Sequence, residues 1–442
     1  MKPRICLLLI GLIAGLQQAA AQVSFTPATN YVVENTPVCV IAADVNGDGP
    51  VDLITANETG HSLTVLTNNG SGVFGSNATL NAFGGPQSVV AADINGDGNV
   101  DLICTSGSGI TVLTNNGSGV FGSNATLNAF GGAQSVMAAD INGDGKMDLI
   151  CNSESAITVF TNNGSGVFGS NAMLNVTGGL VSLVAADING DGNVDLIGLI
   201  IYPSAIIVLT NNGSGAFGSN ATINYPGGGD CLTMADVNGD GKPDIIFAAG
   251  SIPSKIYVWT NNGDGVFGSN ATYTVGEGIL SITAADVNGD GNVDLICANG
   301  ESEPGTLSVL TNDGSGEFGS NVTLNVGSEP CSVVAADVNG DGKMDLISAN
   351  YSANSVSVLI NTSIFSPPTS TPTLNINASG NNVLVSWPSA SAGWSLQQNP
   401  DLTTTNWSPS GYSGYSISDD GTNKSLNMPP ITENLFFRLL HP

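Results

Sequence analysis

Seven copies of a short acidic segment carry the side chains of this chain that are best suited to chemistry. The first copy, residues 44–52, reads DVNGDGPVD, so Asp, Asn, Asp and Asp stand at positions 1, 3, 5 and 9. Calcium takes six to eight oxygen ligands, and short loops supply them from alternate positions. Position 6 is Gly in every copy, as a sharp turn around an ion requires. The segment therefore predicts a calcium-binding loop.

The four side-chain types recur in all seven copies, which predicts about seven Ca²⁺ ions. Position 7 varies among Pro, Asn and Lys, since only its backbone carbonyl would contact the ion. With five or more ligands from the loop, each ion would be structural, because little coordination is left for a substrate. The predicted ligands are Asp44, Asn46, Asp48, Asp52, Asp93, Asn95, Asp97, Asp101, Asp140, Asn142, Asp144, Asp148, Asp187, Asn189, Asp191, Asp195, Asp236, Asn238, Asp240, Asp244, Asp286, Asn288, Asp290, Asp294, Asp337, Asn339, Asp341 and Asp345.

Two other interpretations fit the segments less well. An EF-hand requires Glu at position 12, whereas the first copy has Thr55 there and the other copies have Cys, Gly, Phe or Ser. The segments are also followed by an apolar run such as Val-Asp-Leu-Ile, which is typical of a strand. Simple Asn/Asp/Gly turns of a β protein are the second alternative, but such turns do not keep three carboxylates at fixed offsets.

The net charge agrees with a bound metal. The formal charge is −28, and three Asp in each of seven loops account for 21 of the 36 acidic residues. Seven Ca²⁺ ions would bring the charge to about −14 and would relieve the repulsion between neighbouring carboxylates. With only 8 Lys and Arg, nucleic acid and anionic membrane surfaces are poor partners.

Between consecutive loops the chain repeats one pattern of short apolar segments. In the second repeat the expected strands are residues 89–92, 100–104, 110–114 and 125–128, with an Asn-Gly hairpin turn at 116–117. The loops recur every 47–51 residues. Four-stranded units of this length, repeated seven times, are typical of propeller blades. The sequence therefore predicts an all-β fold, a seven-bladed β-propeller.

The two ends of the repeat array complement each other. The seventh repeat stops after residues 355–360 and lacks a fourth strand, whereas an unassigned segment, residues 25–33, precedes the first loop. This segment aligns with the fourth-strand segment that begins at Phe74. We expect the N-terminal strand to complete the last blade and close the ring.

The repeats resemble a known family. The acidic loop, the apolar strand after it and the segment NNGSGVFG at residues 68–75 are similar to the FG-GAP/VCBS repeat, which occurs in the propeller of integrin α subunits and in many secreted bacterial proteins. The resemblance covers roughly residues 23–362. It implies a seven-bladed propeller with calcium in the loop between the first two strands of each blade.

The remaining segments define the domain boundaries. Residues 1–21 have the charged start, apolar stretch and Ala-rich end of a cleavable signal peptide, which predicts a secreted or cell-surface protein without membrane insertion. The propeller would span 22–362, and a Ser/Thr/Pro linker would occupy 363–372. Residues 373–442 are Trp-rich and predict a small C-terminal β-sandwich of the immunoglobulin or fibronectin III kind.

Two sets of residues in these domains leave alternatives open. Trp387, Trp394 and Trp407 favour core packing over a sugar-binding platform. Six cysteines remain after signal cleavage, and we expect them to be small buried hydrophobes. A Cys39–Cys331 disulfide across the ring closure is the one pairing that deserves a test.

The rim opposite the calcium loops is the expected place for a ligand, because loops on a rigid scaffold carry function. Its residues vary between blades, and its aromatic side chains would either stack on a sugar or protein loop or cover the blade core. The candidates are Phe83, Phe130, Tyr202, Tyr225, Lys255 and Tyr351.

Three functions compete. The first is a non-enzymatic adhesion or recognition module for an extracellular protein or glycan, acting as a monomeric propeller. The second is a lectin-like carbohydrate binder. The third is a polysaccharide lyase or hydrolase, which is disfavoured because the only histidines are His61 and His441 and the clustered acids are assigned to calcium. We expect binding without catalysis.

Overall fold

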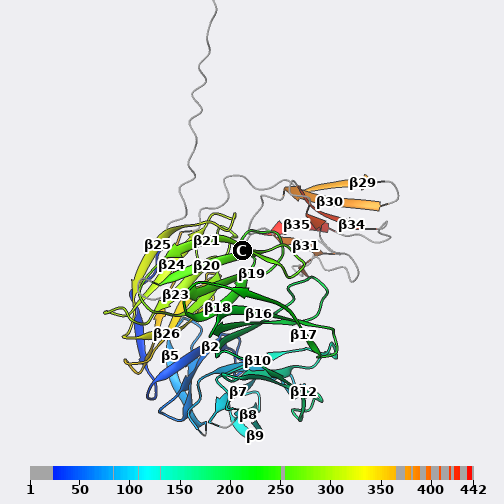
Figure 1. The fold of residues 1–442 in the computed structure, drawn as a ribbon. Helices are drawn as coiled ribbons and strands as arrows, with labels where there is room; N and C mark the ends of the chain where they lie inside the picture. Colours follow the sequence, from blue (N-terminus) through cyan, green and yellow to red (C-terminus); the bar gives the residue numbers. More distant parts are fainter. Residues whose placement is uncertain are drawn as a thin grey trace, which may run out of the picture.

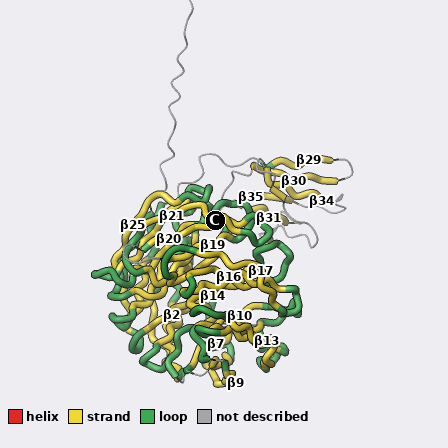
Figure 2. The backbone as a smooth tube through the Cα atoms, in the orientation of Figure 1, coloured by secondary structure: helices red, strands yellow, loops and turns green. Residues whose placement is uncertain are grey.

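A computed structural model describes residues 23–82, 84–107, 109–129, 131–249 and 254–364, together with short C-terminal segments between 374 and 440. Strands make up the regular structure of these ranges, and no helix occurs in them (Figure 1; Figure 2). The all-β prediction is confirmed. The predicted signal peptide and most of the predicted linker lie outside the described residues.

Seven four-stranded antiparallel sheets, called blades 1 to 7 here, follow one another along residues 29–359. In blades 1 to 6 the strands are consecutive in sequence. Blades 1 to 3 comprise β2 (Pro37–Ala43), β3 (Asp52–Asn57), β4 (Ser62–Asn68) and β5 (Phe74–Asn81); β6 (Val89–Ala92), β7 (Asp101–Ser106), β8 (Gly109–Asn115) and β9 (Phe121–Asn128); and β10 (Ser135–Ala139), β11 (Asp148–Asn152), β12 (Ala156–Asn162) and β13 (Phe168–Asn175). Blades 4 to 6 comprise β14 (Leu180–Ala186), β15 (Asp195–Ile201), β16 (Ser204–Asn211) and β17 (Phe217–Asn224); β18 (Gly229–Ala235), β19 (Asp244–Ala249), β20 (Lys255–Asn261) and β21 (Phe267–Thr274); and β22 (Ile279–Ala285), β23 (Asp294–Asn299), β24 (Thr306–Asn312) and β25 (Phe318–Asn325).

Blade 7 closes the ring in the predicted way. It combines β26 (Pro330–Ala336), β27 (Asp345–Asn350) and β28 (Ser355–Leu359) with the N-terminal β1 (Thr29–Val32). β1 runs antiparallel to β28, with Thr29 opposite Val358 and Val32 opposite Ser355. The first strands of successive blades contact one another from β2 through β6, β10, β14, β18, β22 and β26, and β26 contacts β2. Figure 1 shows the blue β2 close to the yellow β26.

The core lies between neighbouring blades. The second strand of a blade is buried along its whole length in blades 1, 2, 3, 5, 6 and 7, because its Asp-Leu-Ile-type run is apolar on both faces. At the closure, Val40 and Leu53 of blade 1 pack in one cluster with Ile347 and Val358 of blade 7. Since each cluster of the ring is built from two neighbouring blades, every blade depends on its neighbours to bury its apolar faces.

Deletion of residues 23–35 is expected to destabilise the whole ring. The deletion removes β1, the bond from Thr362 N–H to the Ser24 carbonyl (2.7 Å), and Val33 from the closure core. We expect a loss of at least about 5 kcal/mol of unfolding free energy, measured by urea denaturation. The matched control lacks only residues 1–21. A deletion variant that is monomeric and as stable as this control would refute the closure.

Two small sheets form the C-terminal part. Their strand orders are β29-β30-β34-β33 and β32-β31-β35. The bounds are β29 (Asn375–Ser379), β30 (Asn382–Pro388), β31 (Ser395–Asn399), β32 (Ser408–Pro409), β33 (Ser418–Asp419), β34 (Asn423–Met428) and β35 (Phe436–Leu440). Val385, Trp387 and Leu426 of the first sheet share one buried cluster with Leu396 of the second, as in a sandwich. Trp387 is therefore a core residue, whereas Trp394 and Trp407 lie outside the described residues.

The cysteines of the described ranges are unpaired. Cys104, Cys151, Cys231 and Cys297 are buried, which fits their expected role as small apolar side chains. Cys39 and Cys331 are also free thiols in the structure. Burial is the main cause that raises the pKa of Cys331 to about 12. Within the described residues, no helix is long and apolar enough to cross a bilayer.

Candidate functional site

Each acidic loop connects the first and second strands of its blade, so the seven loops lie on one rim of the ring. The first loop turns through two glycines in the left-handed region, Gly47 with φ 75° and Gly49 with φ 102°. A side chain is strained at such angles, which explains why these positions do not vary. The turns between the third and fourth strands lie on the same rim, and the other links lie on the opposite rim.

The side chains at positions 1 and 3 organise the backbone of every loop. In the first loop, Asp44 Oδ1 accepts from Gly47 N–H (2.7 Å) and Asp44 Oδ2 accepts from Gly49 N–H (2.8 Å). Asn46 Oδ1 accepts from Asp48 N–H at 2.9 Å. The bond from position 6 to the first Asp measures 2.7–2.8 Å in all seven loops. In the first loop these bonds fix the direction of each of the three oxygens and leave it a lone pair for another partner.

The Asp at position 9 is buried in all seven loops. Asp52 Oδ1 accepts from Asn68 N–H (2.8 Å), and its Oδ2 accepts from Val45 N–H (3.3 Å). Desolvation is the main cause that raises the pKa of these carboxyls, and the other Asp of the same loop add to it. The pKa rises to about 7 for Asp294 and to about 6 for Asp345. A cation in the loop would favour their charged forms.

An Asn that the sequence analysis did not single out connects each loop to the next blade. In blades 1 to 5 it is the first Asn of the Asn-Asn-Gly segment, and in blade 6 it stands before Asp313 and Gly314. Asn115 Nδ2 donates to the Val45 carbonyl of the preceding loop (2.7 Å) and to the Val100 carbonyl of its own loop (2.8 Å). The bonds to the preceding loop measure 2.7–2.8 Å around the ring: Asn68–Val338, Asn115–Val45, Asn162–Ile94, Asn211–Ile141, Asn261–Ile188, Asn312–Val237 and Asn361–Val287. We call these seven residues the tie asparagines.

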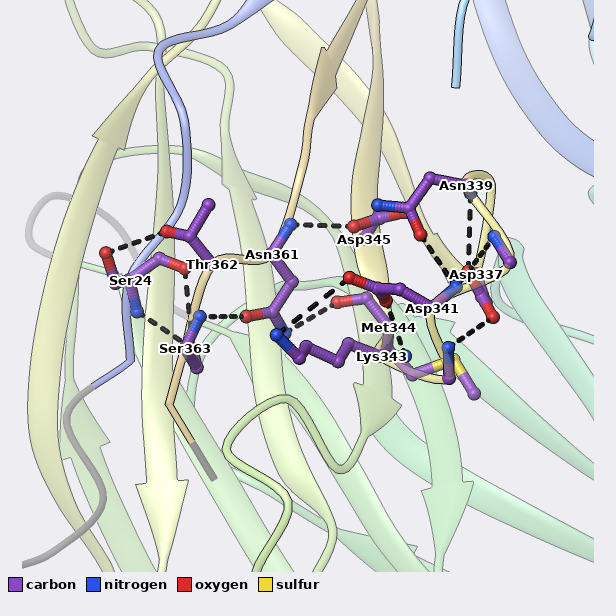
Figure 3. A network of polar contacts seen from close by, with 12 residues as sticks. Ser24, Asp337, Asn339, Asp341, Lys343, Met344, Asp345, Asn361, Thr362 and Ser363 are labelled. Atoms are coloured by element: carbon purple, nitrogen blue, oxygen red, sulfur yellow. Dashed lines mark hydrogen bonds and ion pairs between the residues drawn. The ribbon is translucent and has the colours of Figure 1, made fainter. Parts of the chain in front are cut away.

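Figure 3 shows this network in the last repeat, where Asn361 lies beside Asp345 and Met344 and the N-terminal Ser24 lies beyond it. The sequence contained a signal for the tie asparagines. Asn361 is kept in the seventh repeat although the turn that follows the Asn elsewhere is missing. An Asn needed only for the turn would have no reason to stand there.

The donor set of the loops fits a hard cation. Each loop offers two part-exposed or exposed Asp carboxylates, one Asn amide oxygen, one buried Asp carboxylate and backbone carbonyls, with no nitrogen or sulfur ligand. Across the described residues, no group of three or more His, Cys, Asp and Glu side chains stands close enough to hold a metal as it is. Binding would therefore draw the three carboxylates of a loop together.

The predicted rim residues differ in their surroundings. Tyr202 is 76% exposed and Lys255 is exposed, so both are available to a ligand. Tyr351 is half-buried, and Tyr225 is buried with its hydroxyl donating to the Ile200 carbonyl (3.0 Å). Of the two roles considered for Tyr225, its geometry supports covering the core, where its ring packs edge-on against Phe247. Phe83 and Phe130 lie outside the described residues.

Two cavities are candidates for binding. One, of about 640 Å³, lies between the first strands of blades 1 to 5 and has mostly Val, Ala, Ile and Met on its walls. The other, of about 460 Å³, lies on the rim opposite the acidic loops, where blades 5 and 6 meet, and is polar. We call it the rim pocket; its residues are Thr274, Val275, Gly276, Glu277, Asn299, Ser302, Glu303, Pro304, Thr306, Ser308, Thr323 and Asn325.

The sheets, the ring of contacts and the repeated loops define a β-propeller built from a loop-bearing repeat. The sequence model of the FG-GAP-like repeat matches residues 44–104, 93–151, 140–198, 199–247, 236–297 and 286–348. These matches cover more than half of the chain, which therefore belongs to the family of FG-GAP-like repeat proteins. No curated protein matches the chain by sequence.

Solved structures agree on the fold. One similar structure concerns the specific recognition of non-reducing terminal N-acetylglucosamine by a lectin of Agrocybe aegerita, with a TM-score of 0.50 and 23% identity over 66% of this chain and 81% of the lectin. Another is BBS1N in complex with ARL6DN, soaked with mercury, with a TM-score of 0.58 and 13% identity over 78% of this chain and 98% of BBS1N. A lead-soaked form of that complex has a TM-score of 0.55 and 14% sequence identity, over the same shares of the two chains.

Proposed function

We propose that this protein is a secreted, calcium-stabilised β-propeller that recognises an extracellular glycan or protein without chemical conversion. The observation that carries the proposal is the division of roles between the two rims. The acidic loops repeat the same side chains and bonds in every blade, whereas the opposite rim differs between blades and holds the rim pocket. A rigid scaffold with one variable rim suits recognition.

Calcium would be bound by positions 1, 3, 5 and 9 of each loop and by the carbonyl of position 7. The ion would neutralise the loop carboxylates and hold the link between the first two strands of a blade. The bonds from Gly49 N–H to Asp44 and from Asn68 N–H to Asp52 orient these two carboxylates, which an ion would then draw closer together.

A glycan is the partner that the rim pocket favours. The rim pocket is lined by hydroxyl, amide and carboxylate groups, which suit the hydroxyls of a sugar. The similar lectin recognises N-acetylglucosamine, which supports a glycan by analogy of fold alone. The BBS1N complex supports protein recognition by the same kind of analogy.

A glycan-array screen of the calcium-loaded protein tests the proposal. We expect binding to a defined set of terminal sugars, and we expect the signal to fall by about tenfold or more in excess EDTA, because the blades lose their order. If the folded protein binds no glycan, a cross-linking search for cell-surface partners follows. Shortened or unsaturated oligosaccharides released from pectin, alginate or glucan would contradict the non-enzymatic part of the proposal.

A further inference from the structure

The rim pocket contains a hydrogen-bond acceptor that the protein leaves unpaired. Asn299 ends β23 with a side chain that is 1% exposed. Its Nδ2 donates to Thr306 Oγ1 (3.0 Å) and to Ser308 Oγ (3.0 Å). No donor among the described residues reaches its Oδ1. Buried amide oxygens are nearly always paired, so this one needs an explanation.

Equivalent residues in two other blades show which hydrogen-bond donor Asn299 Oδ1 lacks. In blade 1, Asn57 Nδ2 bonds Ser62 and Thr64 in the same way, and its Oδ1 accepts from Thr55 Oγ1 at 2.9 Å. Blade 7 repeats this arrangement with another set of residues. There Asn350 Oδ1 accepts from Ser348 Oγ at 3.2 Å.

Blade 6 has Cys297 at the position of Thr55 and Ser348, three residues after the last Asp of the loop. A thiol is a weak donor, and Cys297 is fully buried. Two hydroxyl groups of blade 6 therefore hold the Asn299 amide nitrogen in place, but no hydroxyl of this blade donates to Asn299 Oδ1.

The wall of the pocket beside this amide is a glycine. A Cβ on Gly276 would lie 2.5 Å from Asn299 Oδ1, so any other residue would push against the amide. Because Asn299 is almost fully buried, a ligand would reach Oδ1 only after the Gly276 backbone shifts aside. A glycine is the residue that allows such a shift at the lowest cost.

The charges around the pocket select the type of ligand. Glu277 and Glu303 line it, and no Lys or Arg does. Glu301 and Asp230 stand close enough for the charge of Glu301 to act on Asp230. Acceptors outnumber permanent donors, since hydroxyls serve as either. An anionic ligand is disfavoured, and a ligand with several O–H groups is favoured.

We propose that the rim pocket binds a sugar residue without negative charge, one of whose hydroxyls donates to Asn299 Oδ1 in place of the donor that Cys297 does not supply. The proposal deepens the recognition function and rests on it. A pocket of about 460 Å³ is within the usual size of small-molecule sites.

The substitution Cys297→Ser tests the proposal, because it introduces the donor found in blade 7 with the exchange of a single side-chain atom. The probes are the methyl glycosides of glucose, galactose, mannose and N-acetylglucosamine, with methyl glucuronide as the anionic control. Binding to the full-length mature protein in calcium is measured by ligand-observed NMR titration. Cys104→Ser is the matched control, since Cys104 is buried at the same position of blade 2 and has no Asn two residues later.

We expect at least one neutral glycoside to bind and the glucuronide to fail. Cys297→Ser should weaken binding about tenfold, which corresponds to about 1.4 kcal/mol, without lowering the melting temperature. Cys104→Ser should bind the glycoside as the wild type does. Glu303 is exposed, and Glu303→Gln should weaken glycoside binding several-fold.

Two results would contradict the proposal that the rim pocket binds a neutral sugar. In the first, a neutral glycoside binds equally well to wild type, Cys297→Ser and Glu303→Gln; the recognition function then stands, and its site lies elsewhere. In the second, none of the neutral glycosides binds the folded protein. The glycan array then decides whether a larger glycan or a protein is the partner.

Discussion

Removal of calcium with excess EDTA is expected to lower the melting temperature of the protein by about 20 °C or more. At a free concentration one hundred times Kd, each ion adds about 2.7 kcal/mol to the stability of the folded state. Seven equivalent loops would add roughly 19 kcal/mol. One kcal/mol shifts the melting temperature of a domain of 150–250 residues by about 2–4 °C, and that of a longer chain by less.

The structure explains why the effect should be large. The position-9 carboxylates are buried, and without an ion they share each loop with two more carboxylates. Among the described residues, the ion pairs of these carboxylates are made by lysines at position 7 of three loops, as in the exposed Lys146–Asp144 pair at 3.4 Å. Such exposed pairs contribute little.

Calorimetric melts in millimolar Ca²⁺, in EDTA, and in EDTA followed by excess Ca²⁺ provide the measurement. Magnesium is the matched control, because it prefers six ligands in strict octahedral geometry and should restore little of the stability. An identical melt with and without EDTA would show that the loops are ordinary turns, the alternative that the sequence left open.

The repeated part of the fold was predictable because the same sequence pattern recurs in every blade. The Asp-Leu-Ile run after each loop predicted the buried second strand, and the missing fourth strand of the seventh repeat predicted the closure by β1. Seven copies turn a weak local signal into a reliable one. For Tyr225 the sequence left two roles open, contact with a ligand or cover over the blade core, and its burial in the structure supports the second. One aromatic residue in a link between blades does not reveal which way it points.

Hydrogen bonds between side chains and distant parts of the chain could not be predicted from the sequence. Asn115 and Val45 are 70 positions apart, and the local pattern around Asn115 describes only a hairpin turn. The unpaired Asn299 was equally hidden, because the sequence shows Cys297 and Ser348 at equivalent positions but not the amide that each one faces. Both features follow from how blades align in space.

Asn115→Ala is expected to lower the unfolding free energy by about 3 kcal/mol. The side chain is 4% exposed, and its loss leaves the Val45 and Val100 carbonyls without the amide donor. A buried group left unpaired costs about 1–3 kcal/mol. Asn116→Ala is the matched control in the same turn, because Asn116 is exposed and its side chain accepts bonds from Ser118 of that turn. It should cost less than about 1 kcal/mol in the same urea titration.

The same variant separates two roles of the tie asparagines. The Asn115 side chain contacts the loop at 44–52 through the Val45 carbonyl and the loop at 93–101 through the Val100 carbonyl, so the substitution disturbs these two neighbouring loops. The bond from the Asn115 backbone N–H to Asp101 Oδ1 is kept in Asn115→Ala. A calcium titration of Asn115→Ala should then show two weakened sites, by about tenfold each, with the remaining sites unchanged. If stability falls while every site keeps its affinity, the ties only hold the blades together. If two sites weaken, each tie transmits the order of one loop to the next, and because the ring has no end, calcium binding at any loop supports both of its neighbours.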